Sequence, residues 1–297
     1  MTRPAVLPTI TRRRCGAAAL VLLLAGPALH AQTQAPAQAQ TPTGAIKGHA
    51  TVHDAASAAA VIQRAQVAWP AALTGGAVFV GRWQDAPKPQ PGLRVPVVVF
   101  LHGSSGLGLK AIEDWQRWLA GMGVASVAPD SFALPDRVTY TSPVDTDTYE
   151  RIHALRGSEI ALALKALGEA PWADAGRLLL AGTSEGATAV ARHDGSGFAG
   201  RMIFSWSCED NYFVKSAATQ ATPGRPVLNV ISRSDPYFSP ANPWLGNPRA
   251  EGHCAEAFKA NPQAQVVLLP QAPHTLINLP AARDVTAAFV RRVLLPG

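Results

Sequence analysis

Apolar residues in this chain form short continuous runs that alternate with longer stretches of helical periodicity. The clearest run covers residues 95–101 and is rich in β-branched side chains, as expected of a strand buried on both faces of a parallel sheet. An Ala-rich helix over 55–69 and a strand over 77–83 are predicted before it. After it, the pattern predicts strands at 124–128, 177–181, 201–206, 226–232 and 265–269, and helices at 111–121, 147–167, 185–191, 254–260 and 281–295.

This alternation of strands and helices predicts an α/β fold. We expect a doubly wound, mostly parallel central sheet with helices on both faces. In such sheets ligands bind outside the carboxyl ends of the strands. The polar residues that directly follow each strand are therefore the candidates for a functional site.

The first 31 residues form a distinct segment with a basic start and an apolar middle. It contains no acidic residue, and the apolar stretch 17–29 follows the arginines Arg3, Arg12, Arg13 and Arg14. This pattern predicts a signal peptide over 1–31 and export to the periplasm or the medium. Because the apolar stretch is short and contains Gly26 and Pro27, no stable membrane span is expected after cleavage.

The segment 32–47 is rich in Gln, Ala and Pro, lacks apolar periodicity and is predicted to be a flexible linker. Residues 48–297 are then expected to form one domain. The whole chain carries a formal charge of +6, but without residues 1–31 it has 22 basic and 20 acidic residues, a net charge of +2. This balance gives no support for a nucleic-acid partner.

Two cysteines, Cys208 and Cys254, remain after removal of the signal segment. In an oxidising compartment they could form a disulfide, and their separation of 46 residues is equally compatible with two buried free thiols.

The sequence Gly182-Thr183-Ser184-Glu185-Gly186 lies between a predicted strand and a predicted helix. A serine on such a sharp turn has a strained backbone, and side chains two positions before and after it would collide, which accounts for both glycines. The strand and helix on either side are the context that this motif requires. Ser184 is therefore a candidate nucleophile.

A serine nucleophile requires a general base and an acid that orients the base. Asp235 follows the strand predicted at 226–232, and His274 follows the strand predicted at 265–269, in the chain order expected after the nucleophile. Glu209 and Asp210 also follow a strand and are alternatives for the acid.

The oxyanion of an acyl-transfer intermediate requires two hydrogen-bond donors. One candidate is the backbone N–H of Glu185, at the start of a helix. The other is the backbone N–H of Ser104, with Ser105 as the alternative, in the loop after residues 95–101. We expect His102 to hold this loop in place. The side chain of Glu185 is expected to favour the helix N-terminus, with a role near the nucleophile as the alternative.

These residues carry a family resemblance. Segments 97–106, 128–132 and 182–186, together with Asp235 and His274, resemble α/β-hydrolases of the dienelactone-hydrolase-like group over about residues 76–295. The resemblance implies the α/β-hydrolase fold, a Ser-Asp-His site and hydrolysis of a small-molecule ester or related acyl compound, without a cofactor. The founding dienelactone hydrolases have cysteine as the nucleophile, so a serine at position 184 favours a carboxylesterase.

Other interpretations compete with this one. A non-catalytic secreted binding protein could have the same fold. The glycines of segment 106–108, with Asp130 after the next strand, resemble a dinucleotide fingerprint, although four residues separate them from the strand end. His49 and His53 have the spacing of metal ligands on a helix, but no third ligand is evident. Aromatic residues after the later strands could line an acyl or aryl pocket or belong to the core: Trp206, Tyr212, Phe213, Tyr237, Phe238 and Trp244.

Overall fold

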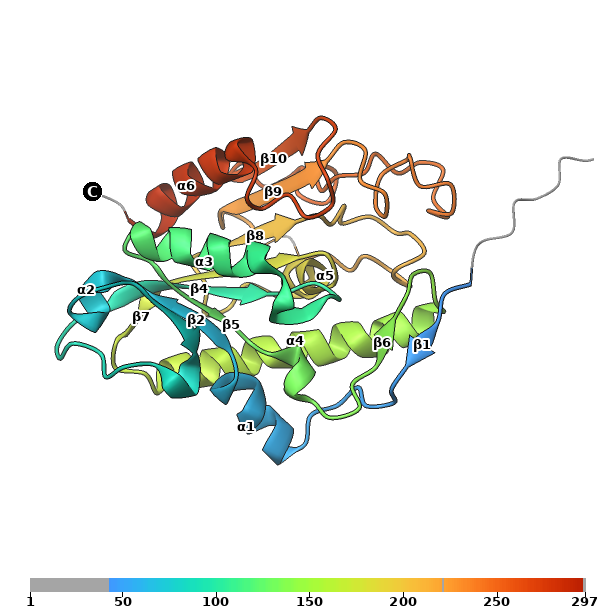
Figure 1. Cartoon of the computed structure of the whole chain (residues 1–297). Coiled ribbons are helices and arrows are strands. Elements are labelled where there is room, and N and C mark those ends of the chain that lie inside the picture. The colour runs from blue at the N-terminus through green and yellow to red at the C-terminus, as the bar shows by residue number, and fades with distance from the viewer. Residues whose placement is uncertain (1–42, 221, 296–297) are drawn as a thin grey trace, which may run out of the picture. The chain divides into compact units, whose positions relative to one another are not determined.

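The computed structural model describes residues 43–220 and 222–295, and its centre is an eight-stranded sheet with helices on both faces (Figure 1). The predicted signal peptide, residues 1–31, and linker residues 32–42 lie outside the described residues. The strand order is β3-β2-β5-β4-β7-β8-β9-β10. These strands are β2 (Gln66–Trp69), β3 (Phe79–Arg82), β4 (Val95–Leu101), β5 (Ala125–Ala128), β7 (Ala173–Thr183), β8 (Gly200–Phe204), β9 (Val227–Ser232) and β10 (Ala264–Leu269).

All neighbouring strands from β5 through β10 are parallel, and only β2 runs antiparallel to both of its neighbours. The predicted mostly parallel sheet is confirmed. Its register brings the carboxyl ends of the strands to one edge, because Leu101 pairs with Gly182, Thr183 with Phe204, and Ser232 with Leu269.

Successive residues of β4 pack into two different cores, as the alternation of side chains along a strand requires. Val97 and Val99 belong to one apolar cluster, and Val98 and Phe100 belong to another. The first cluster includes residues of α4 (Thr146–Gly168) and α5 (Glu185–Arg192), and the second includes residues of α3 (Lys110–Gly121) and α6 (Pro280–Leu294). The remaining helices are α1 (Ala55–Gln63) and the short α2 (Ala71–Thr74). No helix within 43–220 and 222–295 is long and apolar enough to cross a membrane.

One predicted helix is confirmed only in its first part, and another is wrong. The helix predicted over 55–69 ends at Gln63, and Gln66–Trp69 form strand β2, which pairs with β3 and β5. The helix predicted over 254–260 is absent, and hydrogen-bonded turns occupy the segment. In both places contacts with distant residues outweigh local helix propensity.

The last residues of the predicted linker 32–47 take part in the fold. Ile46–Lys47 form β1, which pairs antiparallel with β6 (Thr139–Tyr140) in a separate two-stranded sheet. In Figure 1, β1 and β6 lie side by side at the end of α4. Residues 43–47 thus brace the segment that contains Tyr140.

Cys208 and Cys254 form a disulfide with a Cα–Cα distance of 4.8 Å. The bond is buried, and it connects the loop after β8 to the segment before β10. The backbone N–H of Cys254 also donates to Asn229 Oδ1 on β9, at 3.1 Å. The disulfide therefore anchors two loops beside the edge where the strands end.

Candidate active site

Ser184 lies at the turn between β7 and α5, with φ at +53° and ψ at −121°. A positive φ is unfavourable for a residue with a Cβ, and such strain is retained at positions where the surrounding structure enforces it. The main chain is held on the next strand, since the Ser184 N–H donates to Phe204 O at 3.0 Å. Ser184 is thereby fixed after the carboxyl end of β7, at the start of α5.

The two glycines of the turn have no room for a side chain, as the sequence predicted. A Cβ on Gly182 would lie 2.8 Å from the carbonyl carbon of Gly186. A Cβ on Gly186 would lie 2.3 Å from the carbonyl oxygen of Leu101 on β4. The tight turn therefore depends on glycine at both positions.

His274 and Asp235 follow β10 and β9, respectively, and their side chains form a hydrogen bond. His274 Nδ1 is 2.7 Å from Asp235 Oδ2, and the aspartate is fully buried. Asp235 Oδ1 accepts hydrogen bonds from the N–H groups of Tyr237 and Phe238, at 2.9 and 3.1 Å. The carboxylate is thus fixed on one side by its own loop and on the other by the imidazole.

A mostly parallel eight-stranded sheet now presents a serine turn after β7, an acid after β9 and a histidine after β10. This arrangement decides the fold family. The chain has the α/β-hydrolase fold.

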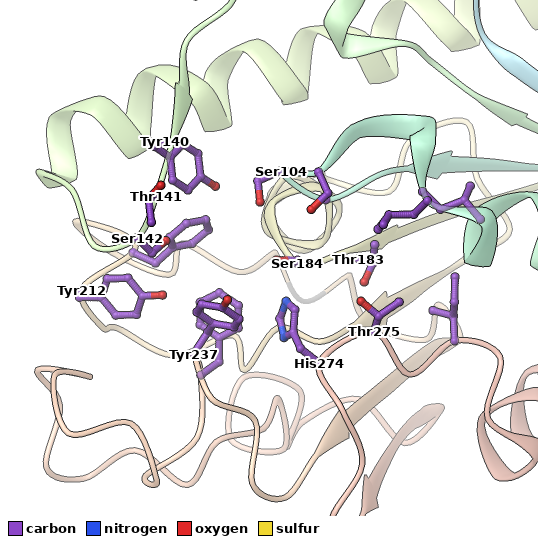
Figure 2. Close-up of a pocket in the computed structure, with 17 residues that line it drawn as sticks. Ser104, Tyr140, Thr141, Ser142, Thr183, Ser184, Tyr212, Tyr237, His274 and Thr275 are labelled. Carbon is purple, nitrogen blue, oxygen red and sulfur yellow. The ribbon is translucent and has the colours of Figure 1, made fainter. Parts of the chain in front are cut away.

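Ser184 and His274 line the same pocket, together with Ser104 and Ser105 of the loop after β4. Figure 2 shows the His274 ring directed toward Ser184, with Ser104 on the opposite side of Ser184 in this view. A Cβ on Gly103 would lie 3.3 Å from the Cβ of Ser184, so this loop passes directly beside the serine. In α/β-hydrolases, a backbone N–H of the loop at this position is one of the two oxyanion donors, and the other directly follows the nucleophile.

The alternative acids, Glu209 and Asp210, bind backbone amides instead of His274. The Glu209 carboxylate accepts from the N–H groups of Glu251 and Gly252, at 2.7 and 2.9 Å. Asp210 Oδ1 accepts from the N–H of Ala217 at 2.7 Å. Both carboxylates therefore hold loops of the structure.

His102 holds the loop after β4, as predicted from the sequence. Its Nδ1 is 2.7 Å from Gly103 O, and its Nε2 accepts from the N–H of Ser131 at 3.2 Å. These partners require the neutral tautomer with the proton on Nδ1. Burial, and next the charge of Arg156, hold the pKa of His102 well below its ordinary value, so the ring stays neutral.

The side chain of Glu185 belongs to a buried polar network that the sequence analysis did not anticipate. Arg137 Nη2 donates to Glu185 Oε1 at 2.7 Å, and the hydroxyl of Tyr140 donates to Glu185 Oε2 at 3.0 Å. Burial, followed by the charge of Glu185, raises the pKa of Tyr140 well above its ordinary value, so this hydroxyl remains a donor. From the sequence, the expected role of this carboxylate was to favour the helix N-terminus, with a role near the nucleophile as the alternative.

A second arginine links this network to the loop after β4. Arg156 Nη2 donates to His102 O at 3.0 Å, and Arg156 Nε lies 3.6 Å from Glu185 Oε1. Arg137 Nε donates to Ser131 Oγ at 2.7 Å, and Ser131 in turn contacts His102. A closed ring of contacts thus connects Glu185 to the loop that contains Ser104.

The network is electrically balanced, because Arg156 also pairs with Glu159, at 2.6 Å. Two buried arginines therefore face two buried glutamates. The signal in the sequence was a charged pair three residues apart on an otherwise apolar helical face. The partners Arg137 and Glu185 are 48 residues apart, and no local pattern connects them.

Glu185→Gln is expected to lower the free energy of unfolding by about 3–5 kcal/mol, because it leaves a buried arginine without its counter-charge. Urea unfolding followed by circular dichroism measures this. The control is Glu113→Gln, which removes a half-exposed pair with Arg117 and should cost less than about 1 kcal/mol. Equal small losses in both variants would contradict the role given to the network.

Four of the six aromatic residues singled out in the sequence line the pocket, namely Tyr212, Phe213, Tyr237 and Phe238. Trp206 is buried in the core, and Trp244 packs against Tyr212 with ring centroids 4.4 Å apart. The pocket has a volume of about 230 Å³. Its other walls combine hydroxyl groups of Ser, Thr and Tyr with aliphatic side chains.

The residues behind the competing interpretations have other roles. Gly106–Gly108 form a short 3-10 turn, and the carboxylate of Asp130 accepts from the N–H of Phe132 and pairs with Arg64, at 3.1 Å each. His49 and His53 contact different carboxylates, those of Asp136 and Glu159. The side chain of His53 is 5% exposed, whereas that of His49 is 94% exposed. Among the residues that the structure describes, no group of three or more His, Cys, Asp or Glu side chains is arranged to hold a metal.

No family model and no curated protein matches the sequence. Similar solved structures include a protein from Klebsiella pneumoniae assigned as a dienelactone hydrolase, with a TM-score of 0.49 and 18% identity over 71% of this chain and 90% of that chain. The esterase domain of a Rhodothermus marinus protein has a TM-score of 0.47 and 19% identity over 77% and 98% of the two chains. Dipeptidyl peptidase 4 of Porphyromonas gingivalis has a TM-score of 0.48 and 16% identity over 69% and 32%. At these identities and TM-scores the similarities assign no activity to this chain.

Proposed function

We propose that the chain is a serine hydrolase that cleaves a carboxylic ester of a small molecule. The observation that carries the proposal is the strained Ser184 in the same pocket as His274, whose other ring nitrogen is bound to the buried Asp235. A serine hydroxyl becomes nucleophilic only beside a base that is itself oriented.

In the proposed mechanism, Ser184 Oγ attacks the ester carbonyl while His274 Nε2 takes its proton. His274 then gives this proton to the leaving alcohol oxygen as the C–O bond breaks, which leaves an acyl-enzyme. Water attacks the acyl-enzyme in the same way, with His274 again acting as base. Asp235 keeps the proton on Nδ1 and stabilises the imidazolium that forms in each step.

The oxyanion is stabilised by the backbone N–H groups of Glu185 and Ser104. Support comes from the start of α5 at Glu185, where unpaired amides and the helix dipole favour negative charge. The ring of contacts through Arg137, His102 and Arg156 would keep the two donors at a constant separation. The proposed reaction requires no cofactor.

Treatment with a fluorophosphonate probe tests this proposal, because the probe reacts with activated serines. Mass spectrometry of the digested protein is expected to find one adduct, on Ser184, together with turnover of 4-nitrophenyl acetate. Heat-denatured protein is the control and should not be labelled. Absence of both labelling and turnover in the native protein would refute the proposal.

We also propose that the protein is exported, with residues 1–31 as a cleaved signal peptide. The buried disulfide supports this, because such bonds persist in oxidising compartments. The protein recovered from the periplasm or medium of a bacterial host is expected to begin at Gln32 by N-terminal sequencing. Leu23→Arg, which interrupts the apolar stretch, should retain full-length protein in the cytoplasm. An exported protein that still begins at Met1 would contradict cleavage.

A further inference from the structure

Four aromatic residues that follow β8 and β9 line the pocket, and we call Tyr212, Phe213, Tyr237 and Phe238 the aromatic wall. The rings are in mutual contact: the centroids of Phe213 and Phe238 are 5.3 Å apart, and those of Tyr212 and Phe213 are 5.9 Å apart. In Figure 2, Tyr212 and Tyr237 lie on the same side of Ser184. Such a surface favours a flat aromatic partner over an aliphatic group of equal size.

The aromatic wall is tied to the catalytic acid and stands next to the base. Asp235 Oδ1 binds the backbone amides of Tyr237 and Phe238, so the loop that orients His274 also positions these two rings. Their ring centroids are 4.7 and 5.9 Å from that of His274. The aromatic wall is accessible from solvent at Tyr237, since this residue is 38% exposed.

The position of the wall beside His274 indicates which part of an ester it contacts. In the proposed mechanism His274 protonates the leaving alcohol oxygen, so the alcohol portion of the ester must lie on the His274 side of Ser184. The acyl portion of the ester then lies on a different side of Ser184. The aromatic wall is therefore expected to contact the alcohol portion.

The pocket provides no charged partner for a substrate. Among the described residues that line it, none is Asp, Glu, Lys or Arg. The arginines of the buried network, Arg137 and Arg156, are already paired with Glu185 and Glu159. A carboxylate on the substrate would lose hydration on entering without gaining a cation, which is unfavourable.

We infer that the site selects uncharged esters whose alcohol portion contains an aromatic ring. The aromatic wall binds this ring while Ser184 attacks the carbonyl, and charged esters are excluded. This inference rests on the proposed function and narrows its substrate class.

Three acetate esters with similar leaving groups test the inference. Benzyl acetate carries the aromatic ring, cyclohexylmethyl acetate carries a saturated ring, and 4-(acetoxymethyl)benzoate adds a carboxylate. We expect kcat/KM for benzyl acetate to exceed that for cyclohexylmethyl acetate by about tenfold. The kcat/KM for benzyl acetate should also exceed that for 4-(acetoxymethyl)benzoate by at least about tenfold.

Two variants and a control connect these preferences to the pocket. Tyr237→Leu should reduce the preference for benzyl over cyclohexylmethyl acetate to about twofold, because it removes the ring next to His274. Phe79→Leu makes the same kind of change on β3, away from the pocket, and should leave the ratio unchanged. Thr141 is exposed and lines the pocket, so an arginine at this position can pair with a carboxylate on the substrate. Thr141→Arg should therefore raise kcat/KM for 4-(acetoxymethyl)benzoate by at least about tenfold.

The outcomes separate the inference from the proposed function. Hydrolysis of all three esters at equal kcat/KM would overturn the inference and leave the serine hydrolase intact. The inference would also be overturned if Phe79→Leu reduced the preference for benzyl over cyclohexylmethyl acetate as much as Tyr237→Leu does. If no ester is hydrolysed and the fluorophosphonate does not label Ser184, the proposed function fails and the inference fails with it.

Discussion

Replacement of Ser184 by alanine is expected to lower kcat/KM for ester hydrolysis by roughly 10⁴–10⁶-fold. The variant lacks the atom that forms the acyl-enzyme, while the oxyanion donors and the pocket remain. Steady-state hydrolysis of 4-nitrophenyl acetate measures the loss, and circular dichroism checks the fold. Residual activity within tenfold of the wild type would show that Ser184 is not the nucleophile.

The strain at this position allows a second, independent measurement. Alanine retains a Cβ at a φ of +53°, whereas glycine adopts positive φ without penalty. Ser184→Gly should therefore be inactive like Ser184→Ala but more stable by about 1 kcal/mol in urea unfolding. If the alanine variant is the more stable of the two, the turn is not strained in solution.

The sequence was most informative where one local pattern determines the local structure. The continuous apolar run at 95–101 is β4, and the two glycines around Ser184 predicted a turn without space for side chains. Placement of Asp235 and His274 after successive strands predicted a shared edge, because parallel strands end on the same side. These features need no information about distant contacts.

The sequence was least informative where residues far apart determine the outcome. Gln66–Trp69 continue an Ala-rich stretch but form a strand, because β3 and β5 provide hydrogen-bond partners on both sides. The segment 254–260 is held at its start by the disulfide and by Asn229, and it is too short to be stable as an isolated helix.

The buried network is a further example, and it lies at the centre of the site. Glu185 follows the nucleophile, and the sequence favoured an effect on the helix N-terminus over a role near the nucleophile. Its carboxylate instead binds Arg137 and Tyr140, from segments that precede it by more than 40 residues. Only the fold brings these partners behind the serine.

Asp235→Asn is expected to lower kcat by about 10⁴-fold with little change in fold. The side-chain oxygen of asparagine can still accept hydrogen bonds from the N–H groups of Tyr237 and Phe238. Its NH₂ group then faces His274 Nδ1. That nitrogen must become the acceptor, which moves the ring proton to Nε2, where it blocks removal of the Ser184 proton. The pH-dependent hydrolysis of 4-nitrophenyl acetate by the purified variant measures the loss.

Glu209→Gln and Asp210→Asn are the matched controls for this variant, since each also replaces a carboxylate by an amide in a loop after a strand. Their carboxylates bind the backbone amides of Gly252 and Ala217 among others, so kcat should stay within about tenfold of the wild type. A larger loss in either control than in Asp235→Asn would transfer the role of the acid to that residue. Because His274 Nδ1 lies 2.7 Å from Asp235 Oδ2, we expect the loss to fall on Asp235.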